Sequence, residues 1–124
     1  MRQRGFFRGE WLEVVDLEDR PLAVMPREAV HQRCLLHRSV FVLLYNEKGK
    51  LYLQKRQTDK EPYAGCWDLS AAGHVLAGEA RIEAAGRELY EELRVEAGKL
   101  HPVVRIPGCK ETGYEFATLF RTGS

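Results

Sequence analysis

The amino-acid sequence predicts a single α/β domain with a mixed β-sheet. Short apolar runs separated by turn residues indicate several strands. One long helical pattern, at residues 80–93, is flanked by these strands, as is typical of layered α/β domains. The length of 124 residues suits one hydrophobic core but not two. We expect residues 1–10, which are basic and contain glycine, to form a flexible N-terminal arm and residues 11–124 to form the single domain.

The first elements form a hairpin followed by a short helix. Residues 11–16 alternate as a strand does, a polar turn follows, and residues 22–25 return antiparallel. Pro26 stands where proline is tolerated, at the start of a helix over residues 26–34. Residues 39–45 are apolar on both faces, which predicts a central strand of the sheet.

The remaining strands surround a loop and the long helix. A turn at residues 46–49 predicts a hairpin with a partner strand at residues 50–56. Residues 57–65 form a polar loop that we expect on the substrate side, because connecting segments often carry function. Further strands are expected at residues 67–71, 100–106 and 114–121.

The helix at residues 80–93 carries three glutamates on one side. At about 100° per residue, an apolar stripe is expected to face the core. Glu88, Glu91 and Glu92 are spaced i, i+3 and i+4 and gather on a different face. Their repulsion destabilises the helix unless a cation lies among them, and oxygen ligands suit Mg²⁺ or Mn²⁺. A solvated acidic face is the alternative. The predicted stripe consists of Ile82, Gly86, Leu89 and Leu93.

The spacing around this helix matches a known motif. Gly73, five residues, Glu79, seven residues and then the segment from Arg87 to Val95 resemble the Nudix box, G-x5-E-x7-R-E-U-x-E-E-x-G-U with U aliphatic. Six of its seven fixed residues match. The exception is Arg94, which replaces a glycine at a position that commonly needs a left-handed backbone.

The resemblance implies a Nudix-type α/β/α sandwich with a mixed sheet, in which residues 73–95 form the catalytic loop and helix. It implies a pyrophosphohydrolase that needs Mg²⁺ or Mn²⁺. Glu91 and Glu92 become the main metal ligands, and Glu88 is a further ligand or the base that activates water. The backbone carbonyl of Ala72 and the side chain of Glu115 are additional ligands. Gly73, Glu79 and Arg87 brace the loop against the helix.

The expected substrate is a small diphosphate: a nucleoside diphosphate linked to another group, or a related molecule. Arg38, Lys55 and Arg56 lie at strand ends where they can contact a diphosphate, although such residues are often simply solvated. Tyr63 and Trp67 can stack on a base, but aromatic residues beside a loop more often serve packing.

A second resemblance leaves an alternative open. Residues 37–74 are similar to the isopentenyl-diphosphate isomerase branch of the same superfamily, in which His37, His74 and Glu115 fall where metal ligands would be. Val30 stands where another histidine is expected, with His31 beside it, and Gly113 replaces a glutamate. Ala72 replaces the catalytic cysteine. A third possibility is a Nudix domain that binds a nucleotide or a partner without turnover, because Arg94 departs from the motif.

The composition of the chain limits the classes of partner that we expect. The net charge is +1, from 19 basic and 18 acidic residues, which gives no reason to expect a nucleic-acid or membrane partner. No signal-peptide pattern or long apolar run is visible, and the three cysteines form no paired motif, so we expect a cytoplasmic protein with buried or half-buried cysteines. The four histidines lack the short spacing of a zinc site, so each is expected to be structural.

The chain ends after residues 114–121, earlier than the resemblance implies. Exposed strand edges then favour association, such as a homodimer.

Overall fold

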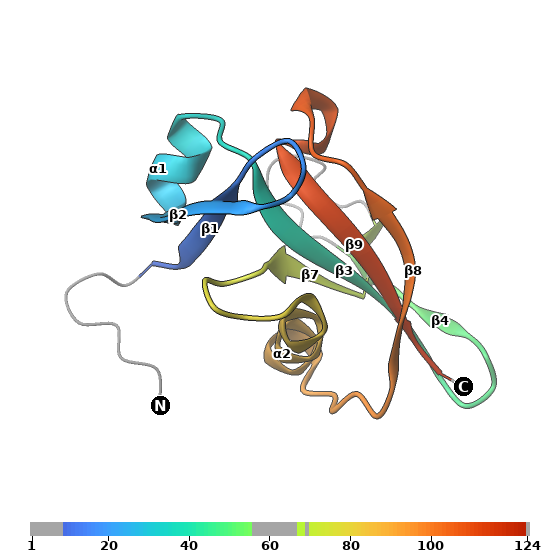
Figure 1. Cartoon of the computed structure of the whole chain (residues 1–124). Coiled ribbons are helices and arrows are strands. Elements are labelled where there is room, and N and C mark those ends of the chain that lie inside the picture. The colour runs from blue at the N-terminus through green and yellow to red at the C-terminus, as the bar shows by residue number, and fades with distance from the viewer. Residues whose placement is uncertain (1–8, 56–66, 69, 124) are drawn as a thin grey trace.

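A computed structural model describes residues 9–55, 67–68 and 70–123, with the backbone alone at residues 54–55 and 67–68 (Figure 1). Two helices, one short 3₁₀ helix and nine strands are present in this part of the chain. The elements run in the order β1 (Trp11–Val15), β2 (Pro21–Pro26), α1 (Arg27–Gln32), β3 (His37–Tyr45), β4 (Leu51–Tyr52), β5 (Gln54–Lys55), β6 (Trp67–Asp68), β7 (Ala71–His74), α2 (Arg81–Leu93), β8 (Leu100–Ile106), η1 (Lys110–Thr112) and β9 (Glu115–Thr122).

The N-terminal hairpin and α1 pack together around a small apolar core. β1 and β2 pair antiparallel, and the Asp16 side chain accepts hydrogen bonds from two backbone N–H groups of the turn between them. Leu12 pairs with Leu76 by an isolated β-bridge, which ties the hairpin to the segment after β7. This places α1 beside the ends of β3 and β7. The buried side chains of this core are Leu12, Val14, Val30 and Leu76.

The main sheet is mixed, as predicted. Its strands run in the order β4-β3-β9-β8, and β7 also pairs with β3. β3 is parallel to β9, with His37 opposite Glu115, and antiparallel to β7, with Ser39 opposite His74. The register therefore brings the start of β3, the start of β9 and the end of β7 to the same edge of the sheet.

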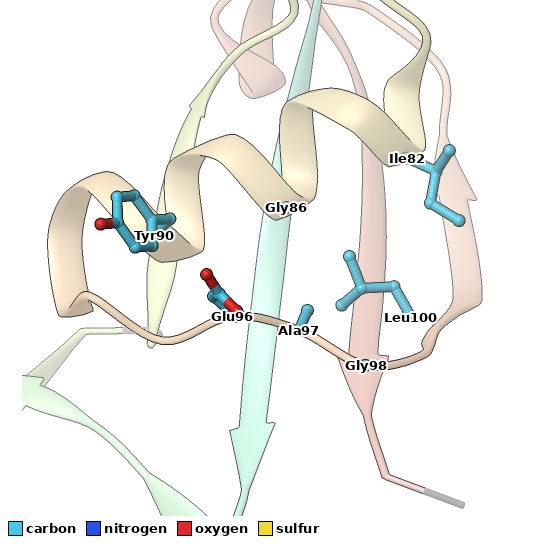
Figure 2. A pocket seen from close by; sticks show the side chains of 7 residues that line it. All are labelled: Ile82, Gly86, Tyr90, Glu96, Ala97, Gly98 and Leu100. Atoms are coloured by element: carbon cyan, nitrogen blue, oxygen red, sulfur yellow. The ribbon is translucent and has the colours of Figure 1, made fainter.

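Helix α2 lies across one face of this sheet (Figure 1) and completes the core. Ala84, Ala85 and Leu89 are fully buried against Val40 and Val42 of β3, while Leu93 is partly buried. The predicted core stripe is wrong in two of its four members. Ile82 is 50% exposed, and Gly86 faces an open groove, shown in Figure 2. The groove runs between one side of α2 and the segment that leads into β8, and is lined by Ile82, Gly86, Tyr90, Glu96, Ala97, Gly98 and Leu100.

Most predicted elements are present, with changes at their ends. The expected strand over residues 50–56 is divided into β4 and β5, and the one over residues 67–71 into β6 and β7. Arg94 adopts the left-handed conformation that its motif position requires, with φ of 58° and ψ of 30°. Cys34 and Cys109 are exposed, so the expectation of buried cysteines is wrong for these two. Cys66, most of the 57–65 loop and most of the predicted arm lie outside the described residues.

Candidate active site

Helix α2 presents the carboxylate cluster of Glu88, Glu91 and Glu92 beside strand β7. The helix begins where the Ala80 N–H donates to the Glu83 side chain, and it ends at the left-handed Arg94. Spacings of three and four residues place the three glutamates on one side of it. They differ in exposure, because Glu88 is only 6% exposed whereas Glu91 and Glu92 are exposed.

Arg87 connects this cluster to the loop that precedes the helix. Its guanidinium donates to Glu79 at 2.7 and 3.1 Å and to the His74 carbonyl at 2.9 Å. It also donates to Glu88 at 2.9 Å and to Glu91 at 3.1 Å. Burial disfavours its charge, but these carboxylates outweigh that effect and hold the pKa of Arg87 above its ordinary value. Two of the three residues predicted to brace the loop, Glu79 and Arg87, are therefore in contact with one another.

Glu79 extends the same network into the loop. One of its carboxylate oxygens accepts from the Leu76 N–H at 3.0 Å while the side chain is paired with Arg87. The loop between β7 and α2 is thus fixed at His74, Leu76 and Glu79. This arrangement holds the end of β7 in a defined position relative to the carboxylate cluster.

Gly73 allows Glu88 to approach the sheet. A Cβ atom added at Gly73 would lie 2.1 Å from Glu88 Oε2, closer than any two such atoms can come. Next to this contact, the Ala72 N–H donates to Glu92 Oε2 at 3.3 Å. Residues 72 and 73 of β7 therefore contact two of the three glutamates through backbone atoms. A side chain at residue 73 would displace the Glu88 carboxylate from this position.

The buried position changes the acidity of Glu88. Burial, followed by the hydrogen bond with Glu92, raises the pKa of Glu88 to about 7, although Arg87 opposes the shift. A carboxyl group that titrates near neutral pH can accept a proton from water. The raised pKa of Glu88 also indicates that a negative charge on Glu88 beside Glu92 is unfavourable unless a cation is bound. The oxygen donors of Glu88, Glu91, Glu92 and the Ala72 carbonyl fit the preference of Mg²⁺ or Mn²⁺.

A second group of ligating side chains lies at the edge of the sheet where β3, β7 and β9 meet. The histidine cluster consists of His31, His37 and His74, and one ring nitrogen from each lies within 4.8 Å of the others. Glu115 adjoins it, with Oε2 at 3.4 Å from His37 Nε2 and 3.5 Å from His74 Nε2. The spacing of the histidines along the chain, from which each is expected to be structural, does not predict this grouping.

The charges of this second group depend on one another. Burial disfavours the charged form of His74, but hydrogen bonds with Glu10 and Glu115 outweigh it and raise its pKa to about 9. Burial raises the pKa of Glu115, yet hydrogen bonds with the nearby His37 and His74 outweigh it and hold the pKa of this carboxyl far below its usual range. Burial and the neighbouring His74 lower the pKa of His31. Glu10, placed in the flexible arm by the sequence, is thus anchored to His74 at 3.1 Å.

Spacing along the chain did not reveal the histidine cluster, because its members come from α1, β3 and β7. The similarity to isomerases pointed to His37, His74 and Glu115, and it expected a further histidine at position 30. Val30 is instead fully buried in the small core, and His31 contacts His74. Val30 and His31 are adjacent in α1 but lie on different faces of the helix, so Val30 packs in the core whereas His31 reaches the histidine cluster.

The predicted substrate-binding residues do not all reach the site. Arg38 donates to Asp19 and Glu13 and to the Asp19 carbonyl, at 2.7 to 2.9 Å, so its guanidinium is engaged within the protein. Lys55 and Trp67 pair through their backbones in the β5–β6 ladder, and their side chains lie outside the described residues. Arg56 and Tyr63 lie wholly outside them.

The family model and the similar proteins agree on one protein family. The NUDIX domain family model matches residues 35–122. "Uncharacterized Nudix hydrolase PA4841" of Pseudomonas aeruginosa is 43% identical over 95 residues, which cover 77% of this chain and 56% of that protein. "Isopentenyl-diphosphate Delta-isomerase 2" of Photorhabdus laumondii is 40% identical over 84 residues, which cover 68% of this chain and 48% of that protein. The chain thus spans about half the length of these relatives.

Structural comparison agrees. The crystal structure of DR0079 from Deinococcus radiodurans matches with a TM-score of 0.75 and 28% identity, and the match covers 93% of this chain and 72% of that one. The matched domain includes β3, β7, α2 and β9, the elements that carry the carboxylate cluster and its surroundings. The chain therefore belongs to the Nudix family.

Proposed function

We propose that this chain hydrolyses a diphosphate by attack of water on phosphorus, with Mg²⁺ or Mn²⁺ held by the carboxylate cluster. The proposed substrate is a nucleoside diphosphate linked to another group, or a related diphosphate. The observation that carries this proposal is the buried Glu88, packed against Gly73 and flanked by Arg87 and Glu92. Membership of the Nudix family supports the same chemistry.

The chain's own groups have separate roles in this reaction. Glu91 and Glu92 would hold the divalent ion, with the Ala72 carbonyl as a further ligand and Glu88 as either a ligand or the base. When bound, the ion neutralises negative charge on the phosphoryl oxygens. In the role of base, Glu88 would take the proton from the attacking water, since it lies buried beside Arg87 and Glu92 at the position where the cluster meets β7. Arg87 fixes the loop through Glu79 and the His74 carbonyl, so that the cluster keeps its position relative to β7.

Lys55, Arg56, Tyr63 and Trp67 remain predicted contacts to the substrate. Arg38 is better explained as a structural residue, because it joins β3 to the N-terminal hairpin through Asp19 and Glu13. A panel of diphosphates identifies the preferred substrate.

The experiment compares turnover of a diphosphate panel by wild type, Glu92→Gln and Glu96→Gln, with and without Mg²⁺. Glu96 is exposed and lies beside the groove on the other side of α2, so it serves as the control. We expect Glu92→Gln to lower kcat/KM by at least about 10²-fold, or about 2.7 kcal/mol of transition-state stabilisation. Glu96→Gln should leave turnover unchanged. Equal Mg²⁺-dependent turnover in all three proteins would contradict the proposal.

Isomerisation of isopentenyl diphosphate is the second candidate function. The histidine cluster beside Glu115 favours it, as does the similarity to the isomerase of Photorhabdus laumondii. Ala72 argues against it, because a methyl group can neither donate nor accept a proton at carbon. Uptake of deuterium by isopentenyl diphosphate in heavy water distinguishes the two. We expect none at a catalytic rate.

A further inference from the structure

We propose that a cavity between the β1–β2 turn and the main sheet binds a small organic anion. The phosphate or carboxylate group of this ligand contacts Arg81 and Arg105, and its apolar body lies against β8 and β9. The cavity, called the arginine cavity below, shares no lining residue with the carboxylate cluster and does not depend on the proposed hydrolysis. Its walls include Leu17, Asp19, Arg81, Arg105, Ile106 and Phe116.

The arginine cavity has the size and lining of a small-molecule site. Its volume is about 310 Å³, and small-molecule pockets span roughly 300–1,000 Å³. Leu17 from the turn is 81% exposed, and Ile106 from β8 is 46% exposed. Apolar side chains that are left open beside a few charged groups are typical of a pocket for an amphiphilic ligand.

Arg81 has hydrogen-bond donors that the protein does not use. It is the first residue of α2, and its Nη2 donates to Asp19 Oδ2. Its Nε is buried and makes no hydrogen bond to any of the described residues. Asp19 also accepts from Arg38 Nε at 2.7 Å, through its other oxygen. One carboxylate is therefore shared by two guanidinium groups, each of which carries five N–H donors.

Arg105 brings a second positive charge to the same cavity. Its guanidinium makes no ion pair with the part of the chain that the structure describes. Burial, followed by repulsion from Arg105, lowers the pKa of Arg81. Glu18, the other carboxylate in the lining, is paired with Arg20 at 2.6 Å. An anion between Arg81 and Arg105 would remove their repulsion and accept hydrogen bonds from both.

These contacts select the class of ligand. The planar guanidinium group matches the geometry of phosphate and carboxylate and binds either with two parallel hydrogen bonds. Ile106 and Phe116 favour an apolar or aromatic body beside the anionic group. A cationic ligand is disfavoured, because both carboxylates of the lining already have arginine partners. The arginine cavity therefore suits an aryl or alkyl phosphate or carboxylate.

The test titrates phenyl phosphate, benzoate and inorganic phosphate into the whole chain by calorimetry. Chelator is present, so that no divalent ion holds phosphate at the carboxylate cluster. We expect one phenyl phosphate or benzoate per chain, and the tighter of the two identifies the anionic group. Inorganic phosphate lacks the apolar body and should bind at least about tenfold more weakly. Absence of binding by both aromatic anions, or equal affinity for inorganic phosphate, would overturn the proposal.

Arg105→Gln should weaken the affinity for the aromatic anion at least about tenfold, because it removes a charged hydrogen-bond donor. Arg105 is exposed, so folding should stay intact, which melting verifies. Arg121→Gln is the matched control: it removes the same charge from an exposed position on β9 outside the cavity. Equal affinity in these two variants would show that the anion is not held by Arg105.

Glu92→Gln separates this proposal from the proposed hydrolysis. It should lose turnover of the diphosphate while keeping wild-type affinity for the aromatic anion in chelator. Loss of that affinity in Glu92→Gln would place the anion at the carboxylate cluster and overturn the assignment to the arginine cavity.

Discussion

Gly73 and Glu88 depend on each other. The glutamate is buried because residue 73 has no side chain, and its carboxylate occupies the space that a Cβ atom would take. Glu92 lies one turn further along α2, and its hydrogen bond with Glu88 contributes to the raised pKa of Glu88. A requirement for glycine at this position is therefore a requirement of the carboxylate cluster.

Gly73→Ala tests this dependence. The new methyl group must displace the Glu88 carboxylate, so we expect kcat/KM for the diphosphate substrate to fall at least about tenfold. Gly98→Ala is the control, since an added Cβ there meets no atom within 4 Å and the backbone is not left-handed. Activity of Gly73→Ala equal to that of Gly98→Ala would show that the position of Glu88 does not matter for turnover.

Glu88→Gln should change the pH dependence of stability in the metal-free protein. Folding raises the pKa of Glu88 from 4.5 to about 7, so its stabilising protonated form is complete below 4.5 and is lost as pH rises through 7. Glutamine cannot ionise and does not suffer this loss. At about 1.4 kcal/mol per pKa unit, the gain at pH 8 is of order 1 kcal/mol or more.

Denaturant unfolding in chelator at pH 5 and pH 8 measures this effect. The advantage of Glu88→Gln over wild type should grow between the two pH values. Glu96→Gln provides the comparison for an exposed glutamate and should follow wild type. A constant difference at both pH values would mean that Glu88 does not titrate in this range.

At the scale of elements, helix α2 shows what periodicity predicts and what it misses. Its limits and the direction of its carboxylates followed from the sequence, but only half of its predicted buried stripe did. The true core face includes Ala84 and Ala85, which are too small to dominate an apolar pattern, together with the polar Glu88. Ile82, the most apolar residue of the expected stripe, faces the groove (Figure 2).

The end of α2 carries a conformational strain that can be measured. Arg94 has a φ of 58°, which costs a non-glycine residue roughly 1 kcal/mol, but its guanidinium lies 5.3 Å from the centre of the Tyr90 ring. Such a contact contributes about 0.5–1 kcal/mol at exposed sites. We expect Arg94→Gly alone to change the free energy of unfolding by no more than some tenths of a kcal/mol.

The Tyr90→Leu background removes the ring and isolates the strain. There Arg94→Gly should stabilise the protein by up to about 1 kcal/mol, and a double-mutant cycle gives the coupling between the two residues. Equal effects of Arg94→Gly in both backgrounds would show that the contact contributes nothing. Melting in the absence of substrate is sufficient for this measurement.

At the scale of the whole molecule, the sequence was sufficient to predict the α/β class and the grouping of Glu88, Glu91 and Glu92, but its spacing did not predict the histidine cluster. The carboxylate cluster lies on one helix, where the distance between residues follows from their spacing. The histidine cluster depends on the antiparallel pairing of β3 with β7 and on the docking of α1 through Leu12 and Val30. Such contacts between distant segments cannot be derived from local patterns.

The described part of the chain also bears on expected partners. None of its helices is long and apolar enough to cross a membrane. The predicted homodimer remains a prediction, and exposed Val103, Val104 and Ile106 on the edge strand β8 are where it would be examined first. Sedimentation of the whole chain at several concentrations checks it.

The central claim, that water attacks phosphorus at the carboxylate cluster, is tested most directly by the fate of the solvent oxygen. The chain is incubated with Mg²⁺ and the diphosphate panel, including isopentenyl diphosphate, in ¹⁸O-enriched heavy water. Phosphorus NMR then locates the label. We predict ¹⁸O in the phosphate of one product, at a rate that Glu92→Gln lowers about 10²-fold, and no deuterium in the isoprenoid. Uncleaved diphosphates with deuterium entering isopentenyl diphosphate at a catalytic rate would contradict the account.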